Sequence, residues 1–269
     1  PFVTGENIDE QLLALIGYHA RTVRRGFKYP DGVLLPQVKV CPVCCGPMDP
    51  SYSLCYSCHK RAEIFKDELA DIVVPLSYAV RGRKDLQQFY SDLNQYKFDK
   101  PSLPAQQRLK VLMLLFRLHH QSCLESAVGH PISAVVAVPS GKNRINHPLP
   151  SIAELLSAPL DGLPGTLLVP ARFVGQPRTG RAQVTNPDDF AIDSQLSGHV
   201  VVVEDTWVQG RNAQGLAIKA RRQGAEAVSI VVLARMLDYT YSYTQLMVDS
   251  WGDDDHFDPL VCPVAGEHC

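Results

Sequence analysis

The chain has 269 residues, a hydrophobic content of 45%, a charged content of 20% and a formal net charge of −2. A globular protein of this length can bury a sizeable core and form one large domain with a smaller one. The net charge does not support a protein that binds nucleic acid mainly through electrostatic attraction, although it is compatible with a local basic patch. The longest apolar runs fall short of the roughly 18 residues that span a bilayer. Since the first residues also lack the features of a secretory signal, we expect a cytoplasmic protein without membrane contact.

Near the N-terminus, apolar residues recur at helical spacing and predict an amphipathic helix over residues 6–25. We interpret residues 1–38 as a helical arm that packs on its own domain. Docking to a partner or dimerisation is the alternative function of this arm.

Four of the eight cysteines form two CxxC pairs with ten residues between them: Cys41, Cys44, Cys55 and Cys58. Two such turns direct four thiolates at one centre, which matches a tetrahedral structural Zn²⁺ site. The alternatives are a rubredoxin-like iron site or a dithiol redox pair, and Cys45 and His59 are the nearest alternative ligands. Structural zinc contributes about 10–16 kcal/mol in small fingers. Residues 39–68 are therefore predicted to form a zinc-ribbon module with almost no core.

Apolar runs alternate with helical spacings downstream and predict an α/β domain with a parallel sheet over residues 69–240. The predicted strands are 72–76, 134–138, 166–169, 200–203 and 227–233, and the predicted helices are 84–96, 105–128, 151–156 and 213–223. On helix 105–128, His119, His120 and Cys123 resemble a metal trio. Because no second ligand cluster stands nearby in the sequence, we interpret them as part of a solvated face and the core.

Four consecutive valines at residues 200–203 run directly into Glu204 and Asp205. An apolar β-branched run of this kind is typical of a strand that is buried on both faces. The acids then stand at the carboxyl end of a central strand, where open α/β sheets bind ligands, and the next helix begins with a phosphate-favouring N-terminus. We predict a ribose-5-phosphate cradle formed by the loop residues Thr206, Trp207, Val208, Gln209, Gly210, Arg211 and Asn212.

Two other loops carry groups that suit anions. Strand 134–138 ends in a loop with Ser140, Gly141 and Lys142, which suits pyrophosphate through backbone N–H groups and a cation. Residues 172–192 contain Arg178, Arg181 and several chain breakers, and they are predicted to form a basic lid or merely a mobile connection.

The last segment, residues 241–269, is acidic and rich in turn residues. Within it Cys262, His268 and Cys269 are candidates for a second, incomplete metal site, with His256 as a further candidate. Frayed terminal thiols are the alternative interpretation.

In the order of these parts the chain resembles the ComF-like phosphoribosyltransferases, relatives of the amidophosphoribosyltransferase domain. The motifs that carry the resemblance are the CPVC…CYSC ribbon, VVAVPSGKNRINHPL, the looser RTGRAQ…N…DDFAI, and VVVVEDTWVQGRNAQGLAIKARRQGAEAVSIVVLAR. The resemblance covers about residues 41–235. It implies a type I phosphoribosyltransferase fold behind an N-terminal zinc ribbon.

The family chemistry is displacement at the anomeric carbon of phosphoribosyl pyrophosphate, with Mg²⁺ on the leaving pyrophosphate. The resemblance implies that Glu204 and Asp205 hold the ribose hydroxyls and favour a developing oxocarbenium ion. Loop 206–212 would then wrap the 5-phosphate. The remaining implied roles are pyrophosphate binding by Ser140, Gly141 and Lys142, and neutralisation of the leaving group by Arg178 or Arg181.

The phosphate loop departs from the family pattern at three threonine positions, which here are Val208, Gln209 and Asn212. Each hydrogen bond to a charged group contributes about 1.5–3 kcal/mol, but backbone donors survive any side-chain change. The leading hypothesis is a phosphoribosyltransferase that acts on an unidentified base or amine acceptor. The alternatives are a catalytically silent nucleotide sensor or competence-type factor, and a zinc-stapled scaffold. Residues 76–107 or the C-terminal segment are expected to cover the acceptor.

Overall fold

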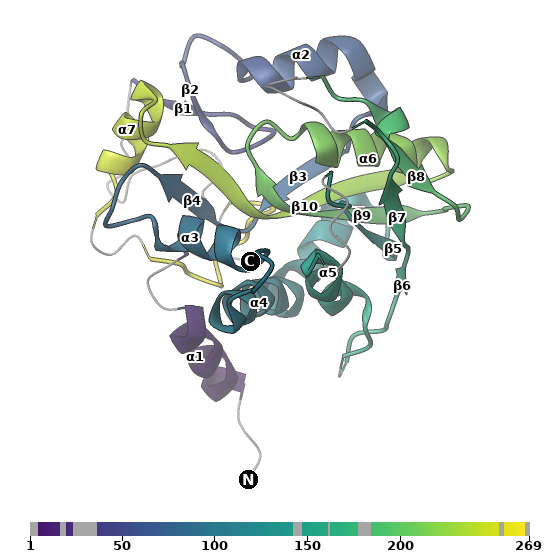
Figure 1. Ribbon diagram of the computed structural model, residues 1–269, viewed down its shortest axis with the longest axis horizontal. Coiled ribbons are helices and arrows are strands. Elements are labelled where there is room, and N and C mark those ends of the chain that lie inside the picture. The colour runs from purple at the N-terminus through teal and green to yellow at the C-terminus, as the bar shows by residue number, and fades with distance from the viewer. Residues whose placement is uncertain are drawn as a thin grey trace.

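The computed structural model describes residues 5–16, 20–23, 37–141, 147–160, 162–176, 184–252 and 256–266 (Figure 1). Its helices are α1 (Gly5–Ile16), α2 (Tyr56–Phe65), α3 (Gln88–Gln95), α4 (Leu103–Val128), α5 (Leu149–Ser157), α6 (Arg211–Arg222) and α7 (Ser242–Asp249), with short 3₁₀ turns η1 (Lys66–Glu68) and η2 (Pro187–Asp189). Its strands are β1 (Lys39–Val40), β2 (Pro47–Met48), β3 (Ile72–Pro75), β4 (Tyr78–Arg81), β5 (Ile132–Ala137), β6 (Leu167–Leu168), β7 (Ala171–Phe173), β8 (Phe190–Ile192), β9 (His199–Trp207) and β10 (Ala227–Asp238).

A six-stranded sheet organises the α/β part of the chain. Its strands run in the order β3-β10-β9-β5-β6, with β4 following β3 along β10, and every pairing in it is parallel. The four valines at residues 200–203 lie in central strand β9 and are fully buried. The predicted α/β fold with a parallel sheet is thereby confirmed, and the arrangement is consistent with a type I phosphoribosyltransferase fold.

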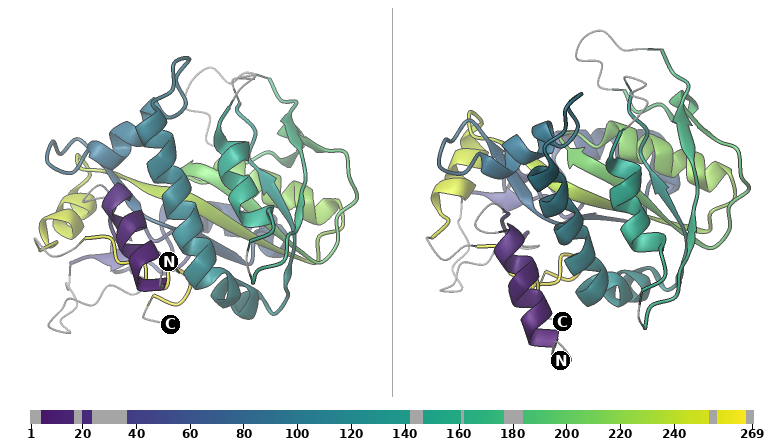
Figure 2. Two further views of the ribbon diagram at one scale, coloured as in Figure 1. Left: turned by 90° about the horizontal axis from the view of Figure 1, so that it is seen from below. Right: turned by 60° about the horizontal axis from the view of Figure 1, so that its bottom comes forward.

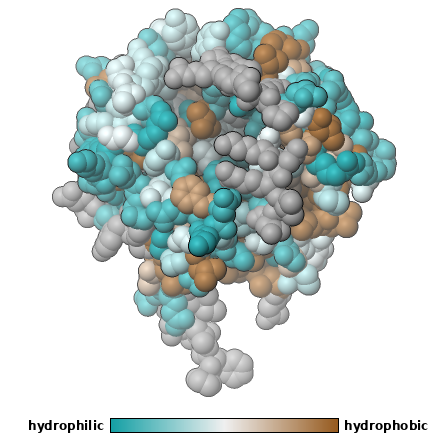
Figure 3. All heavy atoms as spheres, viewed as in Figure 1, coloured by the Kyte–Doolittle hydropathy of each residue, from teal (hydrophilic) through white to brown (hydrophobic). Residues whose placement is uncertain are grey.

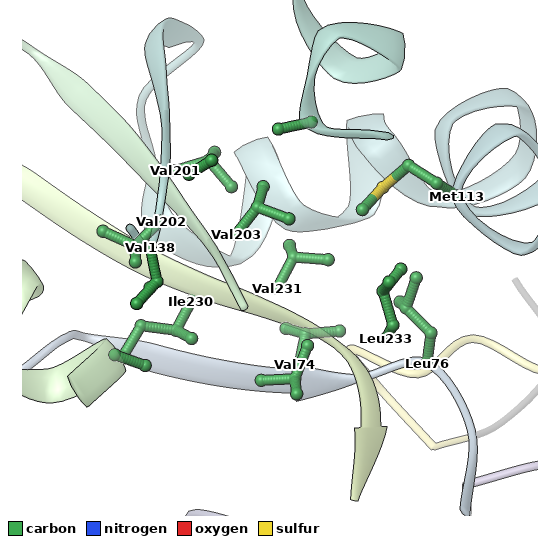
Figure 4. Packing of buried hydrophobic residues seen from close by; sticks show 14 of the residues in the cluster. Val74, Leu76, Met113, Val138, Val201, Val202, Val203, Ile230, Val231 and Leu233 are labelled. Atoms are coloured by element: carbon green, nitrogen blue, oxygen red, sulfur yellow. The ribbon is translucent and has the colours of Figure 1, made fainter. Parts of the chain in front are cut away.

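Helices cover both faces of this sheet. Figures 1 and 2 show α4 and α5 on one face and α6 on the other. In Figure 4, Val203 and Val231 point to the side where Met113 of α4 lies, as the two-residue period of a strand requires. Burial of both faces explains why β9 and β10 are apolar without alternation.

The chain order creates a switch point between β5 and β9. From β5 the chain passes through α5 to the outer strand β6, whereas from β9 it passes through α6 to β10 on the other side. The two connections leave on opposite faces, so a crevice opens at the carboxyl ends of β5 and β9. The loops that follow these two strands are those predicted to bind phosphate and pyrophosphate.

Several elements differ from the prediction. Strand β9 continues to Trp207 and stays paired with β10 up to that residue. Glu204 and Asp205 therefore lie within the carboxyl-terminal part of the strand, not in the loop after it. Helix α1 ends at Ile16, and residues 20–23 are not helical. The predicted loop 172–192 is partly regular, because β7 and β8 form an antiparallel pair.

The N-terminal cysteine pairs stand on a small two-stranded sheet and helix α2, and Cys41, Cys44 and Cys58 pack against the main hydrophobic core. Strands β1 and β2 pair antiparallel around the first CxxC turn, and α2 carries the second pair at its start. Helix α7 packs beside β2, which brings the C-terminal segment to this module. The face drawn in Figure 3 is predominantly hydrophilic, with hydrophobic residues scattered over it. Within the described residues, no helix is both long and apolar enough to cross a membrane.

Candidate functional site

A cavity of about 350 Å³ opens at the carboxyl ends of β5 and β9. Its lining residues come from α3 and its following loop, from the loop after β5, from β9 and from α6: Asn94, Lys97, Phe98, Val138, Pro139, Ser140, Gly141, His147, Glu204, Asp205 and Asn212. Five of the predicted site residues therefore meet in one place, namely Ser140, Gly141, Glu204, Asp205 and Asn212. The crevice expected from the sheet topology is this cavity.

The carboxylate of Asp205 is buried and strongly bonded. Its Oδ2 accepts hydrogen bonds from the Tyr96 hydroxyl at 2.6 Å and from Lys97 Nζ at 2.7 Å, and His147 Nε2 lies 4.0 Å away. Burial by itself raises the pKa of Asp205, but the Lys97 ammonium and the Tyr96 hydroxyl outweigh it and hold the pKa below its usual value. Asp205 is therefore a fixed anion at neutral pH.

The neighbouring Glu204 side chain is half-buried and faces the same cavity. Burial, and then the adjacent charge of Asp205, raises the pKa of Glu204 well above its usual value. Adjacent carboxyls with pKa values moved in opposite directions are a common arrangement in catalytic and binding sites. The pair can present one permanent charge and one carboxyl whose charge depends on a ligand.

Helix α6 begins at this cavity through a tightly built turn. Gly210 is its N-cap residue and has a left-handed backbone with φ of 73°. A Cβ atom at this position would lie 2.1 Å from the Trp207 ring, so only glycine fits. No side chain caps the helix among the described residues, and its first-turn N–H groups are the kind of donor that binds phosphate.

The predicted phosphate loop is divided between two cavities. Thr206, Val208 and Gln209 line a second cavity of about 520 Å³, together with residues of α3, α7 and the end of β10. Asn94 and Lys97 line both cavities, so the two are adjacent. The Trp207 side chain is only 1% exposed and packs inside the loop, so any contact of this residue with a ligand would be made by its backbone.

The four predicted zinc ligands converge in the N-terminal module. The sulfur atoms of Cys41, Cys44, Cys55 and Cys58 all lie within 4.8 Å of one another, so the group is positioned to bind a metal ion. In the first turn, Cys45 N donates to Cys41 O at 2.9 Å. Four thiol groups in this arrangement are compatible with tetrahedral zinc.

The two alternative ligands are directed elsewhere. Cys45 packs in a separate hydrophobic cluster with Tyr78 and Met247. His59 lies 3.2 Å from Glu63 on the exposed side of α2. The ligand pair of the first CxxC turn is therefore Cys41 and Cys44.

Two arginines place positive charge beside the cysteine cluster. Hydrogen bonds from the other three thiols, together with the Arg235 guanidinium, hold the pKa of Cys44 well below its usual value despite its burial. Arg235 Nε is buried and has no hydrogen-bond partner among the described residues. Arg61 Nη2 lies 3.9 Å from Cys58 Sγ. A metal bound by four thiolates carries net negative charge, and both guanidinium groups are placed to balance it.

The same two arginines contact the predicted phosphate loop. Arg235 Nη1 donates to Trp207 O at 3.1 Å and to Val208 O at 3.3 Å. The Arg61 guanidinium lies 5.7 Å from the centre of the Trp207 ring, within cation–π range. Gly46 makes room for this contact, since a Cβ atom there would lie 2.2 Å from Arg235 Nη2. The metal module and the loop before α6 are therefore packed as one unit.

Some predicted residues lie outside the described part of the chain: Lys142, Arg178, Arg181, His268 and Cys269. Other residues of the site were not predicted. Lys97, Tyr96 and His147 reach Asp205 from segments that are far away in sequence, and their local patterns are those of ordinary surface and helix residues. Their role follows only from tertiary packing.

Comparison with protein-family models and with curated proteins finds no match for this sequence.

Proposed function

We propose that the protein binds phosphoribosyl pyrophosphate, or a related ribose phosphate, with Mg²⁺ and transfers the phosphoribosyl group to a base or amine acceptor. One observation carries the proposal: the Glu204–Asp205 pair, the Ser140–Gly141 loop and the start of α6 line one cavity at the switch point of the sheet. A ribose with phosphate groups at both ends requires these three features together.

Each part of the cavity has a role in this reaction. Asp205, held as an anion, accepts hydrogen bonds from the ribose hydroxyls, with Glu204 beside it. The N–H groups at the start of α6 bind the 5-phosphate, and the backbone at Ser140 and Gly141 faces the pyrophosphate. The Mg²⁺ would neutralise charge on the leaving pyrophosphate. The bond from C1 to the pyrophosphate oxygen breaks, the acceptor nitrogen bonds to C1, and the acceptor loses a proton.

The second cavity is the place for the acceptor. It adjoins the first through Asn94 and Lys97, and it is wide enough for a planar base at about 520 Å³. Tyr90 and Tyr241 contribute aromatic side chains to its wall. These residues belong to the two regions that were expected from the sequence to cover the acceptor, residues 76–107 and the C-terminal segment.

Calorimetric titration with phosphoribosyl pyrophosphate and Mg²⁺ tests the binding step. We expect Asp205→Asn to weaken binding by about 10–100-fold, because one charged hydrogen bond contributes about 1.5–3 kcal/mol. The control is Glu226→Gln, which replaces an exposed carboxyl between α6 and β10. This variant should bind the ligand like the wild type. Absence of binding by the wild type at millimolar ligand would rule the proposal out.

A second candidate function is ligand binding without turnover, as in a regulatory nucleotide sensor. It is favoured by Lys97, whose ammonium already pairs with Asp205, and by the hydroxyl-free Val208 in the phosphate loop. Pyrophosphate release, measured across candidate nucleobases and amine donors, separates the two functions. Release with any acceptor supports the enzyme, while binding without release supports the sensor.

A further inference from the structure

A second group of metal-ligand residues is separate from the four-cysteine group. His120 and Cys123 on α4 meet Cys262 of the C-terminal segment, and one ligand atom from each lies within 4.8 Å of the others. His120 and Cys262 are buried and Cys123 is half-buried. The spacing of His120 and Cys123 places both on one face of the helix. The first cluster uses the same spacing at Cys55 and Cys58 on α2.

The C-terminal turn repeats the first zinc knuckle in sequence and in backbone geometry. Cys262-Pro263-Val264 matches the tripeptide that begins at Cys41. In the first knuckle, the N–H of the residue four positions after the cysteine donates to the cysteine carbonyl at 2.9 Å; in the second, Gly266 N donates to Cys262 O at 2.7 Å.

The residue four positions after the cysteine is left-handed in both turns, with φ of 55° at Cys45 and 89° at Gly266. In addition, Ala265 N lies 3.4 Å from Cys262 Sγ and donates to it. A backbone N–H that points at a cysteine sulfur stabilises a thiolate there. The turn therefore holds the Cys262 sulfur in the way that a metal-binding turn holds its cysteine ligand.

The imidazole of His120 is fixed in the form that a metal needs. His120 Nε2 lies 2.6 Å from the carbonyl oxygen of Pro259. A carbonyl only accepts, so Nε2 carries the hydrogen and the lone pair is on Nδ1. Metal-binding histidines usually donate their second ring N–H to a carbonyl or carboxylate in this way.

We propose that His120, Cys123 and Cys262 form a second Zn²⁺ site, which fastens the C-terminal segment to α4. One nitrogen and two sulfur ligands suit zinc, and a water molecule or a further side chain completes the tetrahedron. From the sequence alone, His120 and Cys123 were interpreted as core and surface residues; the proposal departs from that interpretation because Cys262 packs against them in the fold. Of the predicted tail ligands, Cys262 and His256 belong to the described residues, and His256 is not part of this group: its Nδ1 lies 3.4 Å from Arg21 Nη1.

The site stands where three parts of the chain meet. Thr22 Oγ1 donates to His256 O at 2.9 Å and accepts from Asp258 N at 2.7 Å, which ties segment 20–23 to the C-terminal segment. Pro259 then contacts His120 of α4. A metal at this point would cross-link segments that are more than 100 residues apart, and such long-range links stabilise the folded chain most.

Elemental analysis of the purified full chain tests the proposal directly. We expect two zinc ions per chain in the wild type and one in Cys262→Ser or His120→Ala. Cys45→Ser, which alters a cysteine outside both clusters, should retain two. One zinc in the wild type, or a Cys123–Cys262 disulfide in the purified protein, would overturn the proposal.

Two further measurements keep the test decisive if a variant folds poorly. Cobalt substitution of the wild type should give two sets of visible bands, one from four sulfur ligands and one from a mixed nitrogen–sulfur set. The variant Ala265→Cys completes the CxxC pattern of the second knuckle and should retain the second metal longer against a chelator. A spectrum with the four-sulfur bands alone, or unchanged retention in Ala265→Cys, would contradict the site.

Discussion

Arg235 donates from Nη1 to the carbonyl oxygen of Trp207 at 3.1 Å, and the same half-buried side chain stands beside the cysteine cluster. Trp207 in turn packs against Gly210, the N-cap residue of α6. The predicted metal site is therefore joined to the predicted phosphate site through the Arg235 side chain, with Arg61 as a second link. We infer that the cysteine module has a role beyond its own folding, because it contacts the proposed phosphate loop and helps to shape it.

Removal of the metal should weaken ligand binding, although the metal and the ligand are not in contact. Coupling between two sites is typically 1–3 kcal/mol, so we expect the Kd for phosphoribosyl pyrophosphate to rise by about 5–150-fold after chelation. In a Trp251→Phe variant the fluorescence of Trp207 alone reports the change. An unchanged Kd in metal-free, folded protein would show that the two sites are independent.

Gly46→Ala should destabilise the protein by about 1–3 kcal/mol, because the new methyl group overlaps Arg235 Nη2. Urea denaturation measures the loss. The matched control is the same substitution in an Arg235→Ala background, where the overlap is absent and the cost should be smaller. If Gly46→Ala costs the same stability in both backgrounds, the loss comes from the backbone of the first CxxC turn and not from overlap with Arg235.

Lys97→Met should lower the stability of the folded protein, and the loss should be larger at neutral pH than at acidic pH. Loss of one partner from a fully buried ion pair costs roughly 3–5 kcal/mol, and a smaller loss is expected here since the Lys97 side chain is 23% exposed.

The sign of the pH dependence follows from the lowered pKa of Asp205. A lowered folded-state pKa gives stability above about pH 4 that disappears as the pH falls through the folded-state value. The difference between wild type and Lys97→Met should therefore shrink on acidification. Thermal unfolding from pH 7 to pH 3 tests this, with Lys84→Met at an exposed position as a control that should show no such trend. A difference that stays constant with pH would contradict the pairing.

Glu204→Gln should stabilise the free protein while it weakens ligand binding. The pKa of Glu204 is raised in the folded state, so ionisation opposes folding above the ordinary pKa of about 4.3. The amide removes this cost, and we expect a gain on the order of 1 kcal/mol at pH 7, or roughly 2–4 °C in Tm. The gain should vanish below about pH 4, where both states are protonated. A lower Tm at pH 7 would indicate that Glu204 is a structural residue.

The central strands, the cysteine cluster and the position of the acidic pair were predictable because each depends on a local pattern. Four consecutive valines specify a strand buried on both faces, and two CxxC turns at close spacing specify one centre. Strand β4 was missed because its four residues, beginning at Tyr78, give too short a pattern; it forms because β10 offers a parallel edge beyond Pro75.

The partners of the acids were not predictable for a different reason. Lys97 is 108 residues from Asp205 in sequence, and only the packing of α3 against the sheet brings them together. The same holds for His120 and Cys262, which are joined by the fold of the C-terminal segment over α4. Local periodicity contains no information on which distant segments meet.

A structure determined after soaking with phosphoribosyl pyrophosphate and Mg²⁺ tests the central claim most directly. We predict ribose hydroxyls within hydrogen-bond distance of Glu204 and Asp205, the 5-phosphate on the N–H groups at the start of α6, and the pyrophosphate beside Ser140 and Gly141. A ligand bound elsewhere, or an empty cavity at saturating ligand, would contradict the account.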